Sequence, residues 1–258
     1  MLHPKKSLGQ NFLIDKNISN KIIKLINNFE NKNIIEIGPG TGTLTEIITK
    51  KNPKKLILIE KDKFLYEKLF TKYSNNQSIK VYNQDALKFD YNCINKPKSI
   101  VANLPYNISI KLIINWLKNI TDFNEIVVMI QKEVAKKMNY NNTNKMNRLN
   151  VLTALTSNFK IEFDVSRNVF YPKPKVTSSV IKITPKNKMN LNLSKLEDFT
   201  RILFQHKRKK LLNVIPKEMI NLLKLKNNSY DFNNFLNSRA EDLTLDKIII
   251  LFKSFSQI

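Results

Sequence analysis

Cysteine, histidine, arginine and glycine are all scarce in this chain of 258 residues. The single cysteine, Cys93, excludes a disulfide framework and any cysteine-rich zinc or iron–sulfur site. Two histidines, His3 and His206, leave little for a histidine-based site, so we expect no metal. No apolar run approaches the roughly 18 residues of a membrane span, and the first residues contain no apolar signal-peptide core. These absences predict a cytoplasmic protein without a membrane partner.

The four glycines are distributed unevenly along the chain. An average chain contains roughly 7% glycine, so most turns here must use other residues, and the 36 asparagines are the obvious substitute. Three of the four glycines, Gly38, Gly40 and Gly42, nevertheless fall within five residues. Such clustering indicates a place where the backbone requires the absence of a Cβ atom.

The formal net charge of +23 comes mainly from 39 lysines, which accompany only 5 arginines. A strongly basic chain suits a nucleic-acid partner. The joint excess of lysine and asparagine, however, indicates a compositional bias that accounts for part of this charge. The best local candidate for an RNA-binding cluster is Lys207, Arg208, Lys209 and Lys210, with a solvated helix face as the alternative.

Apolar segments of two periodicities alternate over the first two thirds of the chain. They predict strands at 33–37, 55–59, 79–83, 99–102 and 125–130, and helices at 17–29, 43–51, 62–73, 109–118, 131–138 and 147–158. Such alternation predicts an α/β domain built on a mostly parallel sheet. Residues 161–184 are expected to form a loop and a final strand pair, and 139–147 a mobile loop.

The pattern changes after Pro185. Residues 186–194 are typical of a linker, and residues 195–253 carry only helical spacing and no glycine. We therefore expect two domains, an α/β domain over 1–185 and a small α-helical domain over 186–258 that recognises the substrate.

The segment Glu36-Ile-Gly-Pro-Gly-Thr-Gly42 lies between a predicted strand and a predicted helix. Its glycines allow a tight turn and a close approach to a ligand. The spacing is GxGxG rather than the pyrophosphate-binding GxGxxG, and Glu36 favours a cationic or hydroxyl-bearing ligand over a phosphate. S-adenosylmethionine, with its sulfonium and amino groups, fits this turn; a purely structural turn is the alternative.

Two further acids follow predicted strands. Glu60 ends the second strand about 20 residues after the glycine turn, where a carboxylate can accept both ribose hydroxyls of a nucleoside. Asp85 ends the third strand and could accept the amine of a cofactor adenine. Helix capping explains either acid taken alone, but their positions relative to the turn favour the cofactor roles.

The segment Asn103-Leu104-Pro105-Tyr106 follows the fourth strand, at the carboxyl edge where open α/β sheets bind ligands. An exocyclic adenine amine is a poor nucleophile because its lone pair is delocalised into the ring. The Asn103 side-chain oxygen and the Leu104 carbonyl could accept its two N–H bonds and favour a tetrahedral nitrogen. Pro105 would fix the turn, and Tyr106 could stack on the base. The segment thus predicts methylation of an adenine amine without a general base.

These motifs resemble, in order and over nearly the whole chain, the small-subunit rRNA adenine dimethyltransferases. The matching segments are 6–13, 36–45, Glu60, 84–86, 103–109, 131–138, 170–180, 204–213 and 239–247. The resemblance implies a Rossmann-like, S-adenosylmethionine-dependent methyltransferase domain with a small C-terminal α-helical domain. It also implies a product, two adjacent dimethylated adenines in the 3′-terminal hairpin of small-subunit rRNA, made by a monomer acting on the assembling subunit.

The resemblance also implies roles for individual residues. Asn11 and Leu13 would close over the cofactor, and Phe170 would sandwich the target base opposite Tyr106. The full set of implied cofactor contacts is Asn11, Leu13, Glu36, Gly38, Gly40, Gly42, Glu60, Asp85, Ala86 and Asn103. Two departures from the family pattern stand out. Lysine largely replaces arginine at 206–210, which weakens bidentate phosphate binding, and Met146-Asn147 replaces a glycine before the helix at 147–158.

Two other functions remain open at the level of sequence. Large-subunit rRNA methylases of the antibiotic-resistance type share the glycine turn and an NxPY segment, although residues 8–13, 103–109 and 170–176 favour the small-subunit enzymes. A ribosome-assembly or transcription factor on the same fold would need no catalysis. The intact Glu36, Glu60, Asp85 and Asn103–Tyr106 favour an enzyme.

Overall fold

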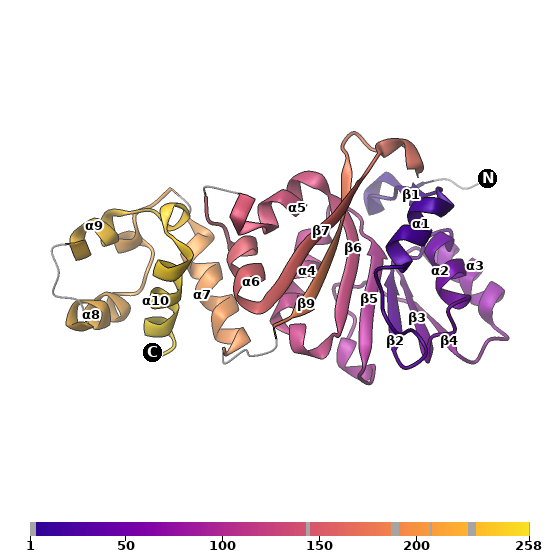
Figure 1. Cartoon of the computed structure of the whole chain (residues 1–258), viewed down its shortest axis with the longest axis horizontal. Coiled ribbons are helices and arrows are strands. Elements are labelled where there is room, and N and C mark those ends of the chain that lie inside the picture. Colours follow the sequence, from indigo (N-terminus) through magenta and orange to yellow (C-terminus); the bar gives the residue numbers. More distant parts are fainter. Residues whose placement is uncertain (1–3, 143–144, 187–190, 207, 227–230, 258) are drawn as a thin grey trace. The chain divides into compact units, whose positions relative to one another are not determined.

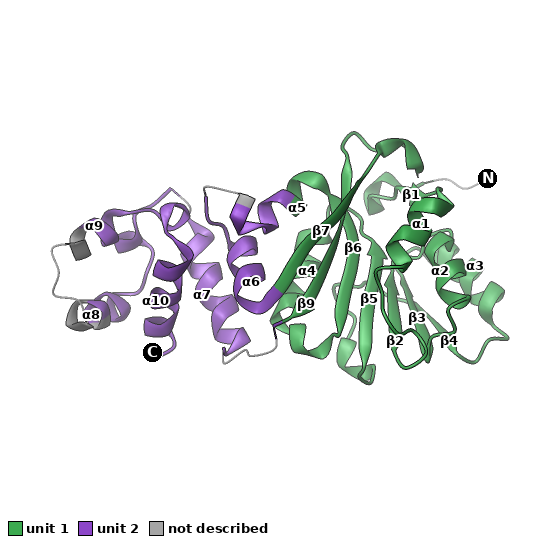
Figure 2. Cartoon of the chain, viewed as in Figure 1, with its two compact units in different colours: residues 1–135, 158–185 green, residues 136–157, 186–258 purple. Residues whose placement is uncertain are grey.

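A computed structural model describes residues 4–142, 145–186, 191–206, 208–226 and 231–257. The chain divides into two compact units, shown in green and purple in Figure 2. Unit 1 comprises residues 1–135 and 158–185, and unit 2 comprises residues 136–157 and 186–258. The predicted boundary at 185 coincides with the point where the chain leaves unit 1 for the last time. Residues 136–157, which the sequence pattern places in the first domain, cluster with unit 2.

Unit 1 is built on a seven-stranded sheet in the order β4-β3-β2-β5-β6-β9-β7 (Figure 1). Its strands are β2 (Asn33–Ile37), β3 (Lys55–Glu60), β4 (Ile79–Asn83), β5 (Lys98–Asn103), β6 (Glu125–Gln131), β7 (Ser157–Val165) and β9 (Ser178–Pro185). The pairs from β4 to β6 are parallel, and β9 is antiparallel to β6. The predicted α/β fold with a mostly parallel sheet is therefore confirmed.

The central strands form because their side chains are apolar on both faces. All five residues of β2 are buried, and so are the first five of β5. Residues such as Ile35, Leu58 and Ile100 are fully inaccessible or nearly so. Near-continuous apolar runs of this kind are stable only where helices cover both faces of a parallel sheet.

The helices of unit 1 connect these strands. They are α1 (Lys16–Ile23), α2 (Thr43–Thr49), α3 (Lys63–Tyr73), α4 (Ser109–Lys118) and α5 (Lys132–Met138), the last of which continues into unit 2. Asp15 and Asp62 begin α1 and α3 as N-caps that accept a backbone N–H. Asparagine does substitute for glycine in turns, because Asn28 and Asn52 adopt φ of 53° and 47°.

A second, two-stranded sheet joins two distant parts of the chain. Strand β1 (Phe12–Leu13) pairs antiparallel with β8 (Phe170–Tyr171), which joins the start of the chain to the segment after β7. Leu13 and Phe170 face each other in this pair and are both buried in the core of unit 1. The segment 161–184, expected to be a loop and a strand pair, thus contains parts of three strands.

Unit 2 is helical. It contains α6 (Arg148–Thr156), α7 (Leu193–Gln205), α8 (Lys217–Lys226), α9 (Asp231–Asn237) and α10 (Leu245–Phe255). Helix α6 packs against α7, and Arg148 of α6 forms an ion pair with Glu197 of α7. Asn147, which stands near the missing family glycine, caps α6 in a reciprocal arrangement with Asn150. The expected loop at 139–147 includes one short 3-10 turn, Tyr140–Asn142, and residues 143–144 lie outside the described part of the chain.

Candidate active site

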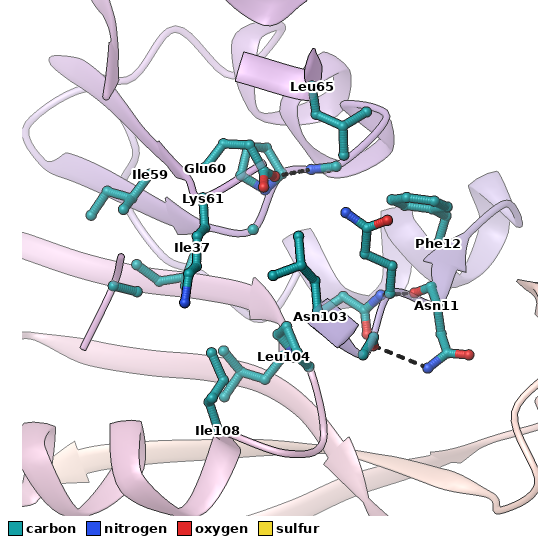
Figure 3. A pocket seen from close by; sticks show the side chains of 18 of the residues that line it. Asn11, Phe12, Ile37, Ile59, Glu60, Lys61, Leu65, Asn103, Leu104 and Ile108 are labelled. Carbon is teal, nitrogen blue, oxygen red and sulfur yellow. Dashed lines mark hydrogen bonds between the residues drawn. The ribbon is translucent and has the colours of Figure 1, made fainter. Parts of the chain in front are cut away.

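A pocket opens at the carboxyl ends of β2, β3 and β5, where the strand order reverses on either side of β2. Twelve of the predicted cofactor and catalytic residues line it. They are Asn11, Leu13, Glu36, Gly38, Gly40, Glu60, Asp85, Ala86, Asn103, Leu104, Pro105 and Tyr106. Figure 3 shows Glu60, Asn103 and Asn11 around this space. Parallel strands bring their carboxyl ends to one edge, so residues far apart in sequence meet there.

The glycine turn requires glycine on conformational grounds. Gly38, Gly40 and Gly42 have φ of 60°, 58° and 84°, in the left-handed region that disfavours other residues. A Cβ atom on Gly40 would lie 2.9 Å from Cδ1 of Phe12, whereas one on Gly38 would meet nothing within 4 Å. Gly38 therefore leaves room at the wall of the pocket. Gly42 does not line the pocket and instead stands at the N-cap position of α2.

Glu36 is a buried carboxyl group in the wall of the pocket. Its Oε2 accepts a hydrogen bond of 2.7 Å from Oγ1 of Thr45. Burial raises the pKa of Glu36 to about 8; the Thr45 hydrogen bond opposes this rise and the negative charge of Glu60 adds to it. Glu36 is therefore largely protonated at neutral pH in this structure. A cation placed beside it would favour the carboxylate.

Glu60 ties the glycine turn to the start of α3. Its Oε2 accepts the backbone N–H of Gly40 at 3.1 Å, and its Oε1 accepts that of Asp62 at 2.8 Å. Burial raises the pKa of Glu60 although these backbone hydrogen bonds lower it. Each carboxylate oxygen has a second lone pair, so Glu60 can hold the turn and still accept hydroxyl groups from a ligand.

Asp85 follows β4 at the rim of the pocket. Its Oδ2 forms an ion pair of 2.8 Å with Nζ of Lys61, and its Oδ1 accepts the backbone N–H of Leu87. Burial alone would raise the pKa of Asp85, but these hydrogen bonds hold it below its ordinary value. The bond from Lys61 lowers this pKa most. Asp85 is thus a fixed acceptor beside Ala86, which also lines the pocket.

The segment Asn103–Tyr106 is held on both sides. The N–H of Leu104 donates to the carbonyl of Met129 on β6 at 3.1 Å, and the carbonyl of Pro105 accepts N–H groups at the start of α4. The hydroxyl of Tyr106 lies 2.8 Å from Oγ of Ser178 on β9. Sheet, helix and side chain therefore fix this loop against the pocket.

Residues 5–13, which we call the N-terminal strap, complete the pocket wall. The backbone carbonyl of Asn11 accepts a hydrogen bond of 2.8 Å from Nδ2 of Asn103 (Figure 3). Sequence reasoning placed Asn11 and Leu13 in this wall but missed Gln10 and Phe12, which also line it. Both belong to the same QNFL segment, so its full length was the available signal.

Phe170 does not line the pocket in this structure. Only 4% of its surface is exposed, and it packs in the core with Leu13, while the neighbouring Tyr171 is 55% exposed. The prediction that Phe170 stacks on the target base would require this ring to move, and it stays a prediction. Of the predicted RNA-binding residues, Arg208, Lys209 and Lys210 are exposed, and Lys207 lies outside the described residues.

Among the residues that the structure describes, no cluster of three or more histidine, cysteine, aspartate or glutamate side chains could hold a metal ion. No helix within the same described ranges combines the length and the apolar character needed to cross a membrane.

Sequence comparisons relate this chain to proteins of known family. A sequence model of the ribosomal RNA adenine dimethylase family matches residues 1–256. A ribosomal RNA small subunit methyltransferase A from Pelagibacter ubique (strain HTCC1062) is 40% identical in an alignment of 262 positions that covers 98% of this chain and 97% of the relative. Its counterpart from Wolbachia sp. subsp. Drosophila simulans (strain wRi) is 38% identical over 258 residues, covering 97% and 93%.

Solved structures extend the likeness to three dimensions. A dimethyladenosine transferase from Plasmodium falciparum superposes with a TM-score of 0.74 at 26% identity, covering 95% of this chain and 98% of that one. A 23S rRNA methyltransferase, ErmE, gives a TM-score of 0.66 at 22% identity, with 95% and 100% covered, and shows the shared fold alone. The match over nearly every residue places this chain in the ribosomal RNA adenine dimethylase family.

Proposed function

We propose that this enzyme dimethylates the exocyclic amines of two adjacent adenines in the 3′-terminal hairpin of small-subunit rRNA. Enzymes of its family transfer methyl groups from S-adenosylmethionine. The observation that carries the proposal is the position of Asn103–Tyr106, which shares one pocket with the glycine turn, Glu36 and Glu60. A target amine at this loop would lie beside a bound methyl donor.

The pocket residues fit S-adenosylmethionine by their chemistry. Gly38 leaves open space where a side chain would stand, and Glu60 offers carboxylate oxygens of the kind that accept ribose hydroxyls. Glu36 is a buried acid, and a positive group facing it would stabilise its carboxylate form. S-adenosylmethionine supplies an activated methyl group when bound, and the protein supplies its orientation.

The chain's own residues prepare the acceptor. Oδ1 of Asn103 and the carbonyl of Leu104 would accept the two amine protons and turn the nitrogen lone pair toward the donor. The ring of Tyr106, held through Ser178, offers a face for a base taken out of its stack. Neither step requires a side chain to remove a proton before the attack. The same arrangement must accept a monomethylated amine, because each adenine receives two methyl groups.

The same proposal covers the RNA substrate, the particle that contains it and the oligomeric state of the enzyme. The curated relatives are named for the small ribosomal subunit. We infer that a monomer acts in the cytoplasm on small-subunit rRNA in the assembling particle, through the exposed Arg208, Lys209 and Lys210 together with Lys207. The helical residues 186–258 would provide recognition, and 1–185 the chemistry.

Methyl incorporation from labelled cofactor tests this proposal. Isolated small and large ribosomal subunits that lack the modification are incubated separately with the enzyme, and the modified bases are mapped. We expect incorporation into small subunits alone, approaching four methyl groups per particle at two neighbouring adenines. Labelling of the large subunit, or of a single adenine, would contradict the proposal.

A further inference from the structure

Asp62 is a buried carboxylate just behind the pocket that none of the roles above uses. It is 4% exposed, begins α3 as the N-cap and does not line the pocket. Its Oδ1 accepts Nζ of Lys5 at 3.2 Å and its Oδ2 accepts Nε2 of Gln10 at 3.1 Å. Burial opposes the charge, yet the hydrogen bonds of Lys5 and Gln10 keep the pKa of Asp62 below its ordinary value.

A hydrogen bond between Lys5 and Gln10 also closes this part of the strap into a turn. The side-chain carbonyl of Gln10 accepts the backbone N–H of Lys5 at 2.7 Å, so one glutamine joins both ends of this turn and the carboxylate below it. Lys5 and Gln10 lie more than 50 positions from Asp62 in sequence. These bonds therefore fix where the strap lies relative to the start of α3, rather than only its local shape.

Between Lys5 and Gln10, the backbone of the strap lies against the segment that follows β5. A Cβ atom on Gly9 would lie 3.0 Å from Oδ1 of Asn107 and 3.6 Å from Cβ of Pro105. Gly9 has φ of 65°, which only glycine adopts readily. Gly9 therefore lets the backbone of the strap lie close to the side chains of Pro105 and Asn107, and Asn11 follows two residues later.

The contact between Asn11 and Asn103 determines which atom Asn103 presents. A backbone carbonyl only accepts hydrogen bonds, so the Asn103 atom that faces Asn11 must be the amide nitrogen. Oδ1 is then the free end of the side chain. If the strap left, the amide could turn over and offer N–H groups to an amine that itself donates.

We propose that Asp62 is a positioning residue that holds the N-terminal strap closed, so that the Asn11 carbonyl keeps the Asn103 amide oxygen toward the target amine. This inference rests on the proposed function for its effect on turnover. Its effect on the strap does not depend on the substrate. Asp62 would act through Lys5, Gln10 and Asn11, without touching substrate or cofactor.

The variant Asp62→Asn tests this role. Asparagine still caps α3 by accepting the N–H of Phe64, which is 3.0 Å from Oδ1. It removes the charge that binds Lys5 and places an amide donor against Gln10. Because the variant loses a charge-assisted hydrogen bond, we expect at least about tenfold faster amide hydrogen exchange over residues 5–13 of the cofactor-free protein. With saturating cofactor and RNA, we expect kcat to fall by a similar factor.

Asp90→Asn is the matched control. Asp90 also accepts the N–H of the residue two positions on, Asn92, at 2.9 Å, but within the described part of the chain its side chain forms no hydrogen bond with the strap. This variant should leave exchange over residues 5–13 and kcat unchanged. Gln10→Ala combined with Asp62→Asn should add little to either single change, because the two side chains act as one unit.

The outcomes separate the two proposals. Wild-type exchange over residues 5–13 in Asp62→Asn would overturn the strap role, and so would faster exchange with an unchanged kcat. A higher KM for cofactor with full kcat would also overturn it, because the strap would then bind ligand without orienting Asn103. If the wild-type enzyme methylates no small-subunit rRNA but Asp62→Asn still speeds amide exchange over residues 5–13, the proposed substrate is wrong. The role of Asp62 in holding the N-terminal strap then stands.

Discussion

The hydroxyl group of Tyr106 lies 2.8 Å from Oγ of Ser178, which joins the catalytic loop after β5 to the antiparallel strand β9. Burial raises the pKa of Tyr106, and the hydrogen bond with Ser178 works against this rise. The tyrosine is therefore neutral over the physiological range. It is held at its polar end, which leaves the face of the ring to meet a base.

Removing the hydrogen bond between Tyr106 and Ser178 and removing the Tyr106 ring should have different effects. Tyr106→Phe keeps the ring but loses the hydrogen bond, whose net contribution is about 1 kcal/mol. We expect kcat to fall less than tenfold, and Ser178→Ala to match it. Tyr106→Ala loses the stacking face and should lower kcat by at least about tenfold more. Single-turnover methylation at saturating cofactor measures the difference, and equal losses in Tyr106→Phe and Tyr106→Ala would refute the stacking role.

Asn103→Ala should abolish methyl transfer while the fold remains intact. The change removes the side-chain acceptor for the amine and the bond to Asn11. Removing one preorganised polar contact to a reacting group costs about 10²–10³ in rate in other enzymes, and we expect a loss at least as large here. Cofactor affinity measured by calorimetry should change only a few-fold, and the unfolding transition should stay cooperative. Turnover within tenfold of wild type would rule out the proposed contact.

Two glycine substitutions should differ although their backbone strain is alike. Gly38→Ala and Gly40→Ala both place a Cβ at φ near 60°, which costs about 1–2 kcal/mol. Only the Gly40 substitution also meets the ring of Phe12, at 2.9 Å. We expect Gly40→Ala to lower the free energy of unfolding more than Gly38→Ala in urea titrations. Equal losses would mean that Phe12 moves aside freely.

The raised pKa of Glu36 gives stability a defined pH dependence. Because the folded pKa of about 8 exceeds the ordinary value of 4.5, the folded state binds more protons between these limits. This carboxyl group therefore favours folding fully below pH 4.5 and loses that contribution as pH rises through 8. Glu36→Gln should flatten the corresponding fall in unfolding free energy between pH 5 and 8. An unchanged slope would contradict the shift.

The same group should couple cofactor binding to proton release. If a cationic cofactor faces Glu36, binding converts the acid to its carboxylate and affinity rises from pH 6 toward pH 8. Calorimetry in buffers of different ionisation enthalpy measures the released proton directly. The Glu36→Gln variant should release fewer protons than the wild type when cofactor binds. Identical proton release by the two proteins would exclude Glu36 as the source.

Neutralising Arg208, Lys209 and Lys210 should weaken RNA binding and reduce its salt dependence. Each lost phosphate contact lowers the slope of log K against log salt by about 0.7–0.9. A variant with Lys51, Lys54 and Lys55 replaced, all exposed, carries the same change in charge elsewhere on the chain. It should keep the wild-type slope. Equal slopes in all three proteins would mean that the cluster is a solvated surface.

The sheet and most of the pocket follow from sequence because parallel strands obey a simple rule. Largely apolar runs such as 33–37 and 56–59 must be buried on both faces, and their carboxyl ends then share one edge. Glu36, Glu60 and Asn103 lie at such ends, so their meeting was predictable without coordinates. The three clustered glycines marked the turn, since few other residues adopt its φ values.

Contacts that link distant segments through one or two side chains could not be predicted. The two-residue strands β1 and β8 are too short to carry any periodicity, and their pairing buries Phe170, whose expected place was beside a base. Residues 136–157 continue the α/β pattern in sequence, yet α6 buries its side chains against α7. The elements against which a helix packs, rather than the spacing of its own apolar residues, decide which unit it belongs to.

Sequence by itself determined the fold class, the edge of the sheet that holds the site and the residue types at that edge, because burial and backbone conformation dictate them locally. Only the tertiary structure decided that Asp62 holds Lys5 and Gln10, and that the Asn11 carbonyl meets the Asn103 amide. A hydrogen bond depends on distances of a few tenths of an ångström between groups many residues apart. No pattern of residue types contains that information.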